Sequence, residues 1–112
     1  MSFSGDLYVG MRGPGATITF TITKPDAFSG SFSAATRSLA VQVTQADGTV
    51  VDLSGFTWAN LTADGGTASV IPDGTEFTYA GRATVAMAIT LNGTLYDFKP
   101  IHVVVKTLDL VS

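Results

Sequence analysis

The sequence predicts an all-β domain, an antiparallel β-sandwich of about seven or eight strands with little or no helix. Three observations lead to this prediction. Apolar and small polar residues alternate with a period of two over several long stretches, as in strands that bury one face. Asx-Gly pairs, the strongest short-range signal of a β-hairpin, separate several of these stretches. No stretch repeats apolar residues at the three- and four-residue spacing of a helix.

The alternation of apolar and polar residues indicates where the strands lie. It is clearest over Ala16–Thr23, where threonines occupy every second position, and over Thr84–Leu91, where apolar side chains alternate with alanine and threonine. Proline cannot donate to a β-ladder, so we expect a break near Pro100, and Ser54-Gly55 indicates another. The predicted strands are Asp6–Val9, Ala16–Thr23, Leu39–Gln45, Val50–Leu61 (broken at Ser54-Gly55), Ala68–Ile71, Thr75–Tyr79, Ala83–Leu91 and Thr94–Leu108.

Turns and a loop connect these strands. The predicted tight turns are Asp47-Gly48, Pro72-Asp73-Gly74 and Asn92-Gly93, each able to supply positive φ angles. Residues 24–38 contain proline, glycine and serine without a clear period, so we expect a long loop with a short helical turn at Ser33–Ser38.

One domain accounts for the whole chain. The 112 residues suffice for one hydrophobic core. The number of strands, the size and the spacing of turns favour a single immunoglobulin-like sandwich over 1–112 with extended termini, although the Cys…Trp…Cys set of antibody domains is absent. The side chains expected in its core are Ile18, Phe20, Val41, Val43, Val85, Met87 and Ile89.

Composition excludes several classes of function. The chain has no cysteine, one histidine (His102) and a formal charge of −3, which argue against a thiolate metal site, a histidine-based triad and a nucleic-acid binder. Met1–Asp6 lacks the basic start and apolar run of a signal peptide, and the apolar runs are too short to span a membrane. We interpret Asp64-Gly65-Gly66 and Asp73-Gly74 as turns rather than calcium loops. The sequence therefore predicts a protein that is not an enzyme and has no cofactor or metal.

The low charge points to an assembled state. Only 13% of the residues are charged, about half the usual quarter, and mean hydropathy is +0.35. Such a surface suits a subunit packed against neighbours, and both ends carry apolar residues that an isolated domain would gain nothing by exposing. Extended termini can add a strand to a neighbour's sheet. The candidate interface residues are Phe3, Leu7, Tyr8, Phe28, Phe32, Leu108, Leu110 and Val111.

Loop aromatics allow two interpretations. Phe28 and Phe32 have no obvious partners in the sequence pattern, so they serve either an interface or local packing. Trp58 and Phe98 lie at strand positions, where aromatic side chains are more often part of the core. Five aromatic side chains could instead form a platform for a sugar: Phe28, Phe32, Trp58, Tyr79 and Tyr96.

The order of short motifs resembles a known family. The chain has Leu7-Tyr8-Val9-Gly10 near its start, Ala46-Asp47-Gly48-Thr49 in a turn after a predicted core strand, and Pro100 followed by Val103-Val104-Val105 near its end. These are similar to the opening, turn and closing elements of small immunoglobulin-like modules of tailed-phage virions, especially the N-terminal domain family of phage baseplate upper proteins. Met11-Arg12 stands where that family usually has aspartate, and Ala46 stands where proline is common in the turn.

The resemblance implies a non-enzymatic structural protein of a bacteriophage virion, located in the particle after assembly in the host cytoplasm. It would serve as a tail, baseplate or neck adaptor or as a capsid decoration subunit. Its partners would be other virion proteins and copies of itself, with no nucleic acid and no membrane. The alternative is a carbohydrate- or receptor-binding β-sandwich module that uses Phe28 or Trp58.

Overall fold

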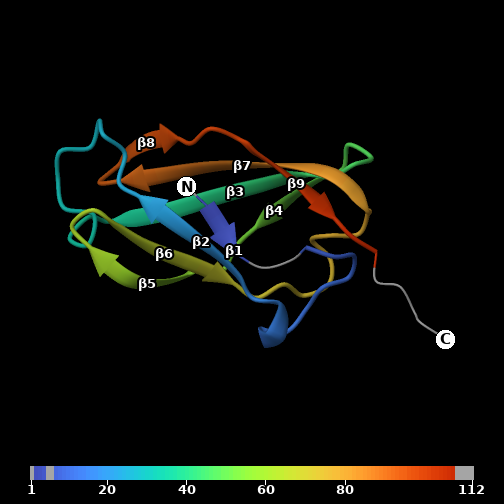
Figure 1. Cartoon of the computed structure of the whole chain (residues 1–112). Helices are drawn as coiled ribbons and strands as arrows, with labels where there is room; N and C mark the ends of the chain where they lie inside the picture. Colours follow the sequence, from blue (N-terminus) through green and yellow to red (C-terminus); the bar gives the residue numbers. More distant parts are fainter. Residues whose placement is uncertain (1, 5–6, 108–112) are drawn as a thin grey trace.

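The computed structural model describes residues 2–4 and 7–107, which form two antiparallel sheets packed face to face (Figure 1). The first sheet has the order β1-β2-β6-β5, and the second has the order β4-β3-β7-β8, with β9 also paired to β7. The strands of the first sheet are β1 (Ser2–Ser4), β2 (Ile18–Thr23), β5 (Thr57–Thr62) and β6 (Gly65–Val70). Those of the second are β3 (Arg37–Thr44), β4 (Val50–Leu53), β7 (Gly81–Leu91), β8 (Thr94–Asp97) and β9 (Ile101–Val105).

This strand order is that of an immunoglobulin-like sandwich. In the usual lettering the first sheet is ABED and the second is C′CFG. The last strand is divided in two, because β8 pairs with the end of β7 and β9 with its beginning, on either side of residues 98–100. Counted as one interrupted strand, β8 and β9 bring the total to eight, and the predicted fold class is confirmed. Helix is confined, within the described residues, to the 3-10 turn η1 (Pro14–Ala16).

Two predicted strands are wrong. Within Asp6–Val9, Asp6 lies outside the described residues, and Tyr8 forms only an isolated parallel bridge to Lys106. Thr75–Tyr79 alternates like a strand, yet its backbone is held by a side chain: the N–H groups of Thr78 and Tyr79 donate to Gln45 Oε1 at 2.8 and 3.0 Å. The N-terminal strand is instead β1, which pairs with β2.

Three short turns close the hairpins. Asn92 and Gly93 have φ angles of 50° and 87°, the left-handed pair that a tight turn between β7 and β8 requires. Asp47 accepts the Thr49 N–H at 2.9 Å, and Gly48 lies at φ 91°, which closes the hairpin between β3 and β4. The predicted turn at Asp64 connects β5 to β6, although β6 begins at Gly65 rather than at Ala68.

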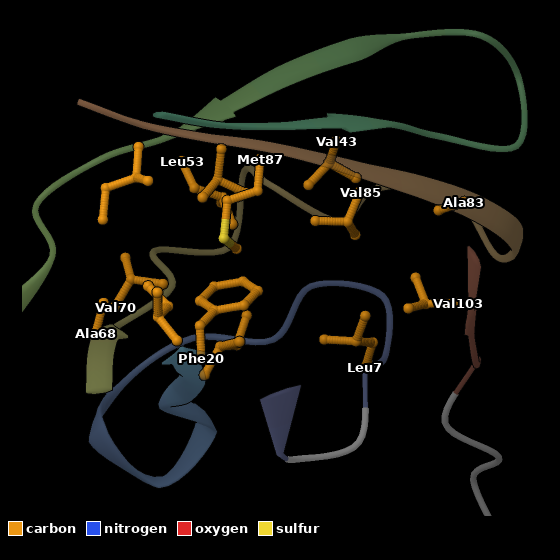
Figure 2. Packing of buried hydrophobic residues seen from close by; sticks show 14 of the residues in the cluster. Leu7, Phe20, Val43, Leu53, Ala68, Val70, Ala83, Val85, Met87 and Val103 are labelled. Carbon is orange, nitrogen blue, oxygen red and sulfur yellow. The ribbon is translucent and has the colours of Figure 1, made fainter. Parts of the chain in front are cut away.

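The core lies between the two sheets. Figure 2 shows Phe20 and Val70 of the first sheet facing Met87 and Leu53 of the second. All seven side chains that the alternation assigned to the core are buried: Ile18, Phe20, Val41, Val43, Val85, Met87 and Ile89. Alternation therefore identified which face of β2, β3 and β7 points inward.

Candidate functional site

The structure separates the predicted interface residues into four groups. Leu7, Phe28 and Phe32 are buried, with exposed fractions of 5%, 8% and 0%. Their side chains therefore pack within the domain rather than forming the predicted interface. Tyr8 is half-buried against the core. The backbone of Phe3 lies in β1, opposite Phe20. The remaining three, Leu108, Leu110 and Val111, lie outside the described residues.

Arg37 holds the loop between β2 and β3 against the domain. The Nη1 group of Arg37 donates to the carbonyl oxygens of Phe32, Ser33 and Ala35 at 2.9 to 3.1 Å. Its guanidinium also lies 5.7 Å from the ring centre of Phe32 and 5.3 Å from that of Trp58. In the segment predicted as a helical turn, Ser33–Ser38, residues 33 and 34 form a hydrogen-bonded turn and residues 37 and 38 belong to β3.

Neighbouring turns also hold this loop. The Phe32 N–H donates to the Ala63 carbonyl at 3.0 Å, and the Thr36 N–H donates to Asn92 Oδ1 at 3.0 Å. Phe28 makes an edge-to-face contact with Tyr96, and Phe32 makes another with Trp58. Neither Phe28 nor Trp58 is therefore placed as an open stacking platform for a sugar.

The acidic residues of the turns serve the backbone. Asp73 Oδ1 accepts both the N–H and the hydroxyl of Thr75, at 3.0 and 2.6 Å, as Asp47 does with Thr49 through its two carboxylate oxygens. The Thr49 hydroxyl and N–H hold the pKa of Asp47 below its ordinary value, and Thr75 has the same effect on the pKa of Asp73. The described part of the chain contains no group of three or more His, Asp or Glu residues placed to hold a metal ion.

The most distinctive surface feature is a groove on the outer face of the second sheet. Its volume is about 680 Å³. The floor consists of Ala40, Ala86 and Ala88, which alternate with the buried side chains of β3 and β7 and therefore point outward. Three alanines in place of longer side chains leave the sheet surface hollow at this point.

Polar and apolar groups form the two sides of the groove. On one side Gln42, opposite both Ala86 and Asp52 in the register, donates to Asp52 Oδ1 at 3.4 Å. On the other side lie Asp97, opposite Ala88, and the interruption at residues 98–100. The groove therefore contains two carboxylates on opposite sides of an apolar floor.

Exposed large hydrophobic side chains lie on the same outer face, outside the lining of the groove. Of the described residues of this kind, those that lie in strands are Val50, Leu95 and Val104, with exposed fractions of 51%, 61% and 61%. Their cross-strand partners are Thr44, Thr90 and Arg82, which place all three on the outer face of the second sheet. Exposed apolar side chains on a face that also has a groove make this face a candidate contact surface.

The sequence did not reveal this surface. His102, the one histidine of the sequence, lies on the same face opposite Thr84. Its ring Nδ1 is 3.2 Å from the Thr84 hydroxyl oxygen. The alanines at alternate positions of β7 were the available signal, because the solvent side of a strand usually carries larger polar residues. Alone, however, they cannot indicate which strands lie beside them.

Comparisons with known proteins identify no relative. The chain matches no protein-family model, and neither the curated proteins nor the solved structures provide a match. None of the helical structure in the described residues is long and apolar enough to cross a membrane.

Proposed function

We propose that this chain is a non-enzymatic structural module of a bacteriophage virion, acting through fixed contacts with other particle proteins and with copies of itself. The observation that carries the contact role is the outer face of the second sheet, which has three exposed hydrophobic side chains and an alanine-floored groove. The placement in a phage particle rests on the resemblance of its turn and strand motifs to virion modules.

The low charge of the chain supports the same role. A protein with 13% charged residues has few groups that keep its surface hydrated, so contact with neighbours covers apolar area at little desolvation cost. The alternative of a sugar-binding module has less support, because Phe28 is buried and Trp58 packs beneath Arg37.

The proposal is tested by particle composition. Purified particles from the source virus should contain the chain at a fixed number of copies, and the neighbouring reading frames should encode capsid, portal or tail proteins. A variant with Leu95→Glu and Val104→Glu, which alters only the exposed face, should fold normally and be incorporated poorly. Thr21→Glu on the outer face of the first sheet is the matched control, and it should be incorporated as well as the unmodified chain. Absence of the chain from the particles would refute the proposal.

A further inference from the structure

At the level of Gln42, the outer face of the second sheet has a bulky half, on β3 and β4, and a small half, on β7. On β3 and β4 the groove is bordered by Gln42 and Asp52, while β7 presents Ala86 and Ala88. Gln42 and Ala86 are direct cross-strand partners, so the boundary between the halves runs along the strands, between β3 and β7. A surface with this division can fit a copy of itself, because a rotation about the boundary places each bulky half over a small half.

Register shows which residues would meet. A two-fold axis parallel to the strands, between β3 and β7, places Gln42 of each copy over Ala86 of the other and Ala40 over Ala88. The long amide side chain then enters the hollow that the alanines leave. Packed sheets need this alternation of large and small side chains to interdigitate.

Charge is complementary in the same arrangement. The rotation places β4 of one copy over β8 and β9 of the other, so Asp52 lies over the interruption at residues 98–100. That interruption carries Lys99, which is exposed and lies level with Ala86 between the paired segments of β8 and β9. A two-fold contact makes this Asp52–Lys99 approach twice. Opposite charges that meet at an interface fix its register.

From these observations we infer that the outer face of the second sheet is an isologous docking surface for a second copy of this chain. The docked pair has Gln42 in the partner's alanine-floored groove and Asp52 beside the partner's Lys99. The inference rests on the proposed function in one respect, since it specifies the contact between copies. It does not depend on which particle, or which part of it, contains the protein.

Sedimentation equilibrium of the purified chain tests the inference. The unmodified protein should associate reversibly to a dimer as its concentration is raised to about 1 mM. Ala86→Arg fills the groove with a bulky charge and should weaken the association by about 100-fold or more. Thr21→Arg is the matched control, because it places the same charge on the exposed outer face of the first sheet and should leave the association unchanged. Thermal unfolding of each variant verifies that it is folded.

Charge reversal tests the register. Asp52→Lys and Lys99→Asp should each weaken the dimer about 10-fold, because each replaces two attractions by two repulsions. The double variant restores both pairs in the opposite sense and should return to nearly the original affinity. An unrestored double variant would overturn the proposed arrangement, as would an Ala86→Arg variant that still forms the dimer. A chain that stays monomeric at every concentration yet is found in virus particles would refute the docking surface and leave the proposed function standing.

Discussion

The two outer faces of the sandwich differ far more than the two inner faces. Both sheets supply buried apolar side chains to one core, and both alternate them with small residues. The four strands of the first sheet contain no charged residue, and hydroxyls cover its outer face. The second sheet instead has alanines, two carboxylates and exposed Val50, Leu95 and Val104.

The hydrogen bonds of the outward-facing side chains show what this difference implies for binding a partner. On the first sheet, Thr19 and Ser69 share a 3.0 Å hydroxyl contact, and the Thr67 hydroxyl donates to the Ala59 carbonyl at 3.1 Å. These hydroxyls are partly satisfied within the sheet, so a partner would gain little from them. The alanines of the second sheet offer neither donors nor bulk, and apolar side chains on the same face remain in water. This difference is the reason that the proposed contacts are placed on the second sheet and not on the first.

The largest expected effect comes from the close approach of two strands within the first sheet. A Cβ atom added at Gly65 would lie 2.2 Å from the Ile22 carbonyl oxygen, so β2 and β6 would have to separate. Gly65→Ala should lower the free energy of unfolding by about 3 kcal/mol or more. Gly15→Ala, where no atom lies within 4 Å of the added Cβ, should change it by less than about 0.5 kcal/mol. Urea denaturation measures both, and equal stability of the two variants would contradict the account of this sheet.

The second prediction compares the inner and outer faces of the second sheet. Ile89 is fully buried, and Ile89→Ala should cost about 3 kcal/mol through lost burial and a cavity. Leu95→Ala, at a 61% exposed side chain, should cost less than about 0.5 kcal/mol of stability but should weaken contacts with partners. Chemical denaturation with a binding or incorporation assay separates the two effects. A large loss of stability on Leu95→Ala would show that the outer face has a role in folding.

Arg37 holds the loop between β2 and β3 at one end of the second sheet. Arg37→Met removes three donated hydrogen bonds and the contact with two aromatic rings, and it should cost about 2 kcal/mol. Arg37→Lys keeps the charge but not the planar guanidinium, and it should recover only part of the loss. Hydrogen exchange should show faster opening at residues 28–36 in both variants. Unchanged exchange there would mean that the neighbouring turns alone hold the loop.

The smallest effect is a dependence on acid at the opposite end of the sandwich. The pKa values of Asp47 and Asp73 are lowered in the folded chain, chiefly by the hydroxyls of Thr49 and Thr75, so folding favours the ionised carboxylates. Their contribution is complete above the unfolded value near 3.8 and is lost as pH falls through the lower folded values. As the pH is lowered from 4, the double variant Asp47→Asn, Asp73→Asn should therefore lose less stability than the unmodified chain. Parallel melting curves down to strongly acidic pH would contradict this assignment.

Much of the fold could be predicted from the sequence, because the alternation of apolar and polar residues is a property of each strand by itself. The inward faces of β2, β3 and β7 and the turn at Asn92-Gly93 were predicted correctly. Thr75–Tyr79 was misassigned because an alternating pattern does not show that a buried Gln45 amide occupies its backbone donors. Gly65 was missed as the start of β6, since glycine contributes nothing to an apolar pattern.

The candidate site was predictable only in part. Contacts with partners, expected from the low charge, stay a prediction. The residues chosen for those contacts included Phe28 and Phe32, which a single arginine and the adjoining turns bury. The groove joins residues from β3, β4, β7 and β8, and only strand order places Ala40 beside Ala88 or Asp97 beside the same floor. Sequence periodicity identifies a face of one strand but not its neighbours.

The docking of a second copy on the outer face of the second sheet can be located residue by residue. A dilution series of amide nuclear magnetic resonance spectra on the labelled chain tests it most directly, because each face reports separately. The account predicts concentration-dependent shifts at Ala86, Ala88 and Leu95, with Thr21 and Thr67 unmoved. Shifts confined to the threonine-covered face, or none at any concentration, would contradict it.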